Sequence, residues 1–235
     1  MSIQVYIGYD RREDIAYKVC KYSINTLDPD IRVKPLVQDY LRATDIYLRP
    51  PDVLASTDFS LTRFYVPAIA RLSMNIPRWA VYVDCDTVFL QSMIVHLLPY
   101  LDASKAVYVV KHEYVSRKEL KMDARLQRSY PRKNWSSFMV FNMQHPKIAA
   151  LNLEMLNSPH LHESEIGELD KTWNFLVGEY TAPDIDAKSL IEPTEFSPNM
   201  LHYTLGGCWL SEEHTPQDYD GIWRHIAENY KRGLE

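Results

Sequence analysis

Short apolar runs alternate with amphipathic segments along most of the chain. Apolar runs predict strands at residues 4–8, 31–37, 79–83, 106–110 and 138–142. Apolar positions that recur every three or four residues predict helices at residues 14–27, 60–74, 146–156 and 218–232. Pro67 is expected to kink the second of these helices, and Pro35 is expected to place its strand at a sheet edge. This alternation predicts an α/β fold with a mostly parallel sheet flanked by helices, in which ligands gather beyond the carboxyl ends of the strands.

Length, composition and charge narrow the class of protein. The 235 residues fit one domain, which we expect to span residues 1–235. Hydrophobic residues make up 46% and charged residues 24%, which excludes a disordered, collagen-like or coiled-coil chain. A net charge of −5 argues against a nucleic-acid partner. The seven glycines fit neither of the two commonest glycine-rich phosphate-binding loops, so any phosphate must be held in another way.

Cysteine usage and hydropathy bear on location. Three cysteines without CxxC spacing argue against a disulfide framework or a zinc site and favour a reducing cytoplasm. The sequence shows neither a leader peptide nor an apolar run long enough to cross a membrane, so we expect a cytoplasmic protein. Residues 117–133 carry seven basic and two acidic side chains. We expect mostly a solvated helix face there, while contact with an anionic acceptor or with the surface of a membrane stays compatible with it.

The strongest chemical signal is a pair of carboxylates, Asp84 and Asp86, directly after the apolar strand at residues 79–83. If the extended geometry persists, both side chains lie on the same side. Two such close carboxylates repel each other, and a bound divalent cation relieves the repulsion. Their hard oxygen atoms suit Mn²⁺ or Mg²⁺, whereas the alternative is a pair that caps the next turn. The sequence therefore predicts a metal site here.

Two further elements carry candidate chemistry. His202 precedes Gly206–Gly207, the one double glycine of the chain. Imidazole can complete the coordination of a metal held by carboxylates, and a double glycine lets backbone amides approach an anionic oxygen. Arg63 lies in a mainly apolar helix and suits bidentate recognition of phosphate or carboxylate. The alternatives are a hydrogen-bonded histidine before an ordinary turn and a solvated arginine.

Five segments, in this order along the chain, resemble the motifs of GT-A glycosyltransferases, especially family 8 and related bacterial enzymes. They are residues 6–10, 60–67, 82–86, 134–142 and 202–209. The resemblance spans nearly the whole chain. It implies a nucleotide-sugar donor, usually UDP-linked, a divalent metal (Mn²⁺ or Mg²⁺) that bridges its diphosphate, and transfer with retention of configuration. It leaves a carbohydrate, a lipid-linked group and a protein open as acceptors.

The same resemblance assigns roles to individual residues. It implies that Asp84, Asp86 and His202 bind the metal. It makes Arg63, which would also contact the donor, and Asp170 the expected catalytic groups. The remaining donor-binding positions that it implies are Gly8, Tyr9, Asp10, Asp84, Cys85, Asn134, Ser136, Trp173, Asn174, Gly206 and Gly207. The sequence departs from family 8 at Cys208–Trp209, where the family commonly has a lysine shortly after its glycine.

Two other functions fit parts of the same pattern. Asp84 and Asp86 after an apolar strand also match the nucleophile motif of haloacid-dehalogenase-type phosphatases, in which the first aspartate attacks phosphorus. That family needs a further acidic pair for Mg²⁺, and Asp184 and Asp186 are the nearest substitute. A non-catalytic nucleotide-sugar-binding protein is the third hypothesis, because an Asp-x-Asp motif can hold a metal without turnover.

Overall fold

The computed structural model describes residues 2–50, 57–113, 134–156, 166–180, 197–210 and 214–234. The basic segment at residues 117–133 lies outside these ranges, as do Asp184 and Asp186. Among the described residues, no helix is both long and apolar enough to cross a membrane. All three cysteines are described, and each is a free thiol.

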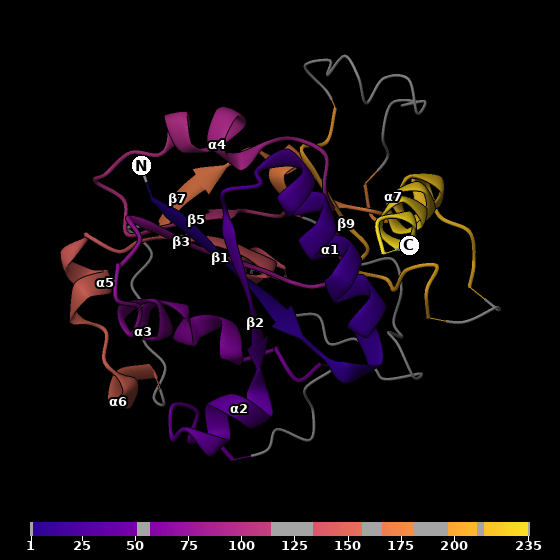
Figure 1. The fold of residues 1–235 in the computed structure, drawn as a ribbon. Coiled ribbons are helices and arrows are strands. Elements are labelled where there is room, and N and C mark those ends of the chain that lie inside the picture. Colours follow the sequence, from indigo (N-terminus) through magenta and orange to yellow (C-terminus); the bar gives the residue numbers. More distant parts are fainter. Residues whose placement is uncertain are drawn as a thin grey trace.

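A central mixed sheet organises the molecule (Figure 1). Its strands, in spatial order, are β2 (Arg32–Val37), β1 (Ile3–Tyr9), β3 (Trp79–Val83), β6 (Phe138–Asn142), β5 (Val107–Val110) and β7 (Ile166–Leu169). β1 runs parallel to β2 and β3, and β5 runs parallel to β7, whereas β6 is antiparallel to both of its neighbours. The predicted mostly parallel sheet is confirmed, and β2, which contains Pro35, lies at its edge as expected.

Helices cover both faces of this sheet. α1 (Asp14–Leu27) and α4 (Met93–His96) pack on one face. The other face carries α2 (Gln38–Ala43), α3 (Val66–Arg71), α5 (Pro146–Ala150) and α6 (Leu153–Leu156), which lie away from α1 in Figure 1. Side chains of β3 alternate between the two apolar cores: Val81 and Val83 face α1, while Ala80 and Tyr82 face α3. The sheet is therefore buried on both sides.

Two predicted helices differ from the structure. The expected helix at residues 60–74 is a 3₁₀ turn, η2 (Thr62–Tyr65), followed by the short helix α3. Pro67 lies in the first turn of α3, where a missing N–H is tolerated, so it begins a helix instead of kinking one. The expected helix at residues 146–156 is divided into α5 and α6, because the backbone of Leu151 is extended.

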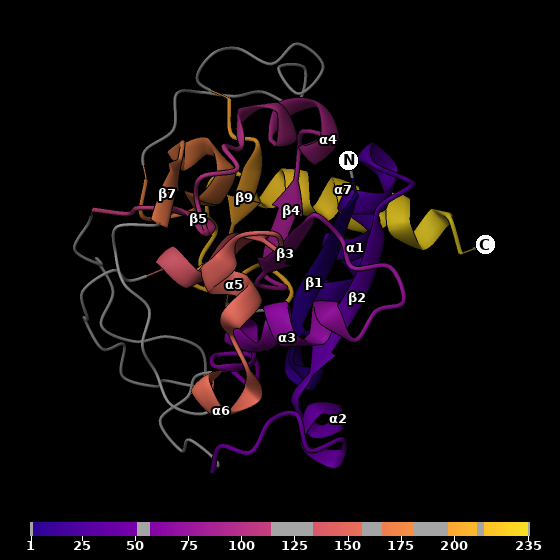
Figure 2. The same cartoon turned by 90° about the vertical axis from the view of Figure 1, so that its left-hand side faces the viewer.

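A second, smaller sheet packs beside the first and was not predicted. It consists of β4 (Thr87–Phe89), β9 (Met200–His202) and β8 (Phe175–Leu176), with β9 in the middle. Figures 1 and 2 both show α7 (Asp220–Arg232) next to α1 and close to β9. Apolar side chains of α1, α7 and the small sheet form a third core cluster. This cluster packs the small sheet against α1 and α7.

Candidate metal and donor site

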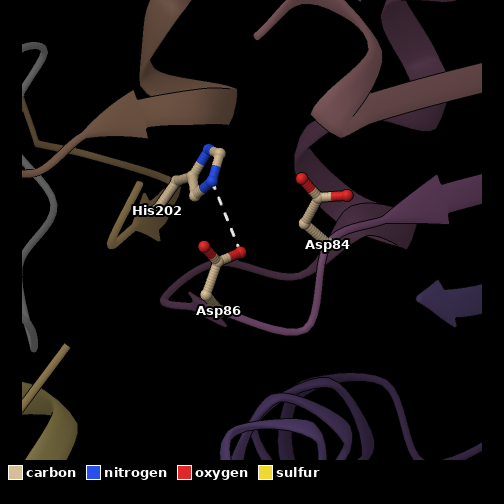
Figure 3. A group of neighbouring side chains, drawn as sticks. All are labelled: Asp84, Asp86 and His202. Atoms are coloured by element: carbon tan, nitrogen blue, oxygen red, sulfur yellow. Dashed lines mark ion pairs between the residues drawn. The ribbon is translucent and has the colours of Figure 1, made fainter. Parts of the chain in front are cut away.

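Asp84, Asp86 and His202 come together where β3 gives way to β4. Their ligand atoms all lie within 4.8 Å of one another, and the three side chains converge (Figure 3). β9 pairs antiparallel with β4 so that His202 lies opposite Thr87, and the Tyr203 amide donates to the carbonyl of Asp86 at 2.9 Å. The strand ends at Val83, so the extended geometry does not persist, and a bend brings both carboxylates into the group.

The donor set of this group fits a divalent cation. Two carboxylates and one imidazole are hard or borderline ligands of the kind that Mn²⁺ and Mg²⁺ accept. His202 is 2% exposed, and its Nε2 lies 3.4 Å from Oδ1 of Asp86. Burial raises the pKa of the Asp84 carboxyl; Arg63 opposes this rise, and the negative charge of Asp86 adds to it. A cation would offset the repulsion between the two carboxylates.

Asp84 is held by two side chains from neighbouring elements. The Tyr82 hydroxyl donates to its Oδ1 at 2.6 Å, and the Arg63 guanidinium lies 3.0 Å from the same oxygen. Gly8, on the adjacent strand, leaves room for that hydroxyl: a Cβ at this position would lie 2.5 Å from the Tyr82 oxygen. Gly8 therefore acts on the site through packing of Tyr82.

Arg63 connects Asp84 to the loop that precedes β6. Its guanidinium donates to the Ser136 hydroxyl at 3.0 Å and lies 5.2 Å above the Tyr82 ring. In the same loop Asn134 has a left-handed backbone (φ 62°), and its amide donates to the Thr204 hydroxyl at 3.1 Å. The structure thus joins Arg63, Ser136 and Asp84 directly, whereas Asn134 ties this loop to the segment after β9.

The loop after β1 is built around Asp10. This carboxylate is 1% exposed and accepts hydrogen bonds from the Arg12 side chain and from the backbone amides of Arg12 and Asp58. Burial raises the pKa of Asp10, but these hydrogen bonds outweigh it and hold the pKa below its usual value. Tyr9, only partly buried, donates its hydroxyl to Asp14. Asp10 therefore orients Arg12 and the loop and has little surface of its own.

Glu13, a buried carboxyl group beside the predicted metal ligands, was not predicted from the sequence. It is 2% exposed, and the Cys85 thiol donates to its Oε2 at 3.1 Å. Burial and the nearby charge of Asp86 raise the pKa of Glu13 to about 8. Cys85, expected to contact the donor, is itself fully buried, with its thiol directed to Glu13. Glu13 lies three positions after Asp10 and directly before a predicted helix. An acidic residue in that place was the sequence signal that could have identified it.

The raised pKa of Glu13 predicts that the metal-free protein loses stability as pH rises. Between its ordinary pKa and about pH 8, the folded chain keeps a proton that the unfolded chain has released, so the free energy of unfolding falls across this window and levels off above it. We expect a total loss of up to about 5 kcal/mol, or up to roughly 10–20 °C in the melting temperature. Glu13→Gln should flatten this dependence in thermal unfolding with chelator present. Glu228→Gln, at an exposed site of α7, is the control and should show the same dependence of stability on pH as the wild type. If the stability of Glu13→Gln fell with pH as steeply as that of the wild type, the raised pKa of Glu13 would be refuted.

The double glycine after β9 is shaped by packing. Gly206 has a positive φ of 91°, which glycine adopts without strain. A Cβ on Gly207 would collide with the indole ring of Trp209, and that ring stacks on Trp223 of α7 with ring centroids 4.8 Å apart. Gly207 thus leaves room for the Trp209 ring, which is itself held against α7.

The segment after β7 reaches the site through one residue. Asp170 is exposed and caps the 3₁₀ turn η7 (Lys171–Asn174), accepting hydrogen bonds from the Thr172 amide and hydroxyl. Trp173 is buried and stacks on Phe138 in the core. Asn174 is fully buried, and its Oδ1 lies 2.8 Å from Nδ1 of His202. Among these three candidates, Asn174 is the one with a described contact to a predicted metal ligand.

Comparisons with known proteins bear on the fold of the chain. No model of a protein family matches the chain. The galactosyltransferase LgtC, solved with donor and acceptor sugar analogues, has a similar fold, with a TM-score of 0.58, 11% identity, and coverage of 96% of this chain and 95% of LgtC. The bifunctional glycosyltransferase WbbM has a TM-score of 0.60 and 15% identity, and the likeness covers this whole chain but 52% of WbbM. These likenesses confirm the expected GT-A fold.

A relative at much higher identity is known from sequence. "Protein CDI" of Arabidopsis thaliana is 34% identical over 239 residues, which cover 97% of this chain and 87% of the plant protein. Identity at this level over nearly the full length of both chains reflects a shared family and not a shared fold alone. The chain, with its GT-A fold and its cluster of two aspartates and a histidine, therefore belongs to the family of Arabidopsis thaliana Protein CDI.

Proposed function

We propose that this protein is a metal-dependent glycosyltransferase that moves a sugar from a nucleotide-sugar donor, UDP-linked, to an acceptor hydroxyl group. The observation that carries the proposal is the convergence of Asp84, Asp86 and His202 within 4.8 Å beyond the carboxyl end of β3, on a GT-A fold. Ligands of open α/β sheets bind at this edge. Residues 1–235 are proposed to act as one catalytic unit.

In this proposal the three side chains hold Mn²⁺ or Mg²⁺. When bound there, the cation would supply positive charge to offset the negative charge on a departing nucleoside diphosphate. Arg63 supplies a second positive charge, and its guanidinium is already oriented by Asp84 and Ser136. We expect most of the catalytic effect to come from these two fixed positive charges, because the side chains that hold them need not rearrange as the bond between the sugar and the diphosphate breaks.

The nucleoside is proposed to lie over the loop at residues 9–12, at the carboxyl end of β1. Tyr9 offers a partly exposed ring there, and Arg12 is held in place by Asp10. Asp10, buried and engaged in hydrogen bonds, acts through Arg12. The exposed, capping position of Asp170 gives it no part in the reaction as we propose it.

The site also favours transfer with retention of configuration. An inverting enzyme needs a carboxylate that can take the proton of the acceptor hydroxyl. Glu13 and Asp10 are both buried, and burial raises the pKa of the Glu13 carboxyl in the metal-free chain to about 8, so neither is open to an acceptor hydroxyl. Asp84 and Asp86 are assigned to the metal. A retaining enzyme has no obvious need of such a base, which accords with this arrangement.

Binding of UDP in the presence and absence of metal tests the proposal. By calorimetry we expect UDP to bind with Mn²⁺ and to bind far more weakly in EDTA, because the carboxylates repel a diphosphate until a cation intervenes. At 100 times its dissociation constant, UDP should stabilise the fold by about 2.7 kcal/mol, or roughly 5–10 °C. UMP, which lacks the second phosphate, is the matched control and should depend less on the metal.

Turnover assays separate this function from its alternatives. Release of UDP from UDP-sugars, dependent on Mn²⁺ and abolished by chelation, supports the glycosyltransferase. Equal affinity for UDP in Mn²⁺ and in EDTA would contradict it. Hydrolysis of a generic phosphate ester would favour the phosphatase instead, in spite of an Asp84 whose Oδ1 is already bound by Tyr82 and Arg63. Metal-dependent binding without turnover would indicate a binding protein.

A further inference from the structure

His202 has a different partner at each ring nitrogen. Its Nε2 points to Asp86, with the two atoms 3.4 Å apart (Figure 3). Its Nδ1 lies on the far side of the ring, 2.8 Å from Oδ1 of Asn174. A neutral imidazole carries one proton, so whichever nitrogen holds it decides whether Nε2 has a lone pair for a metal.

The orientation of the Asn174 amide decides this question. Its Nδ2 faces three acceptors: Nε2 of His112 at 2.9 Å, the Ser137 hydroxyl at 2.8 Å and the carbonyl of Asn134 at 3.3 Å. The hydroxyl of Ser137 donates its own proton to the carbonyl of Asn134 at 2.6 Å, so toward Asn174 it can only accept. A flipped amide would set two oxygen atoms against each other without a proton between them. Oδ1 of Asn174 therefore faces His202, and Nδ1 of His202 must be the donor.

His112 is compatible with this arrangement of protons. It is 6% exposed, and burial lowers its pKa to about 3, so it stays neutral. A neutral His112 that accepts from Asn174 through Nε2 carries its proton on Nδ1, which lies 2.6 Å from the Tyr180 hydroxyl. Each of the two protons on the Asn174 amide thus has an acceptor, and the network from Tyr180 to His202 closes without conflict.

We propose that Asn174 is a positioning residue that holds His202 as its Nδ1–H tautomer, so that Nε2 keeps its lone pair for a divalent cation shared with Asp84 and Asp86. The assignment rests on the metal site of the proposed function. Without Asn174, His202 is free to carry the proton on Nε2 and donate it to Asp86. A proton on Nε2 removes the lone pair that would bind the metal. The hydrogen bond that it makes also occupies one carboxylate oxygen of Asp86.

The tautomer is measured directly in the metal-free protein. Long-range proton–nitrogen NMR correlations of His202 should show a protonated Nδ1 and an unprotonated Nε2 in the wild type. In Asn174→Leu, a near-isosteric change without hydrogen bonds, the signal should shift to the Nε2–H form or to a mixture. Mn²⁺ affinity, titrated with the metal alone, should fall about 10–100-fold.

Two other variants complete the test. Asn142→Leu is the matched control. It removes a buried amide at the carboxyl end of β6, away from Ser137, that donates to the carbonyls of Ala103 and Lys105. This change should leave the His202 tautomer and the Mn²⁺ affinity as they are in the wild type. Asn174→Asp keeps an acceptor for Nδ1–H, and the Ser137 hydroxyl can turn from the Asn134 carbonyl to donate to the second carboxylate oxygen. This variant should therefore preserve the tautomer even if Asn174→Leu does not fold. Finding the Nε2–H form in the wild type or in Asn174→Asp would overturn the proposal. So would a folded Asn174→Leu with wild-type tautomer and Mn²⁺ affinity.

This test is independent of transfer activity. The expected tautomer and the loss of Mn²⁺ affinity in Asn174→Leu would support the positioning role even in a protein that turns over no nucleotide sugar, and that result would count against the proposed function alone. Conversely, a metal-dependent transferase whose His202 carries its proton on Nε2 would keep its function and overturn the role of Asn174.

Discussion

Asp86→Asn is expected to reduce sugar transfer by at least about 10²–10³-fold, the order of effect seen when one preorganised charge-stabilising group is removed. Asp86 is proposed to be an anionic ligand in a group whose atoms lie within 4.8 Å of one another, and water cannot replace its charge. In the metal-free protein the same change should be neutral or stabilising, because Asp86 helps to raise the pKa of Glu13 and of Asp84 through repulsion. The measurements are turnover across a range of Mn²⁺ and thermal unfolding with and without the metal.

The opposite signs of these two effects separate loss of a ligand from loss of fold. The gain in melting temperature that Mn²⁺ gives the wild type should largely disappear in Asp86→Asn. Asp30→Asn is the matched control: Asp30 is exposed and lies two residues before β2, at the amino ends of the parallel strands and therefore away from the site. Wild-type turnover of Asp86→Asn at limiting Mn²⁺ would show that the metal is held elsewhere.

Arg63→Met is expected to destabilise the metal-free protein by about 3–5 kcal/mol, or roughly 6–20 °C. The change keeps the apolar stem of the side chain and removes the cation 3.0 Å from Asp84. Both side chains are largely buried, with 10% and 11% of their surfaces exposed, so the remaining carboxylate has lost its counter-charge in a poorly hydrated place. Because an unpaired Asp84 keeps its proton more readily, the destabilisation should grow as pH rises, which denaturant unfolding at several pH values measures.

A second substitution identifies the cause of that loss. If the unpaired charge is responsible, Asp84→Asn introduced into Arg63→Met should restore much of the stability, which a double-mutant cycle quantifies. Mn²⁺ should likewise stabilise Arg63→Met more than wild type, since the cation replaces the missing charge. Arg32→Met, at an exposed position of β2, is the control and should change stability little. Additive effects of Arg63→Met and Asp84→Asn would mean that the ion pair contributes nothing.

Local sequence pattern predicted much of the central sheet and its helices. The strands at residues 79–83 and 138–142 and the helix at residues 14–27 agree with β3, β6 and α1 to the residue, because each is a strongly apolar or strongly periodic segment. The small sheet was missed, since β4, β8 and β9 are two or three residues long and carry no periodicity to read. Their strand geometry exists because of the pairing between them.

Sequence by itself determined which chemistry was available: a carboxylate pair after a buried strand, a histidine before a double glycine, and an arginine in an apolar segment. Tertiary structure alone decided that these groups meet, because β9 pairs with β4 across more than 100 residues and places His202 opposite Thr87. It also decided that Glu13 is a buried acid, that Asp10 is engaged with Arg12, and that Asn174 is directed at His202. Burial, pKa and proton position depend on which atoms surround a group, and those neighbours are distant in the sequence.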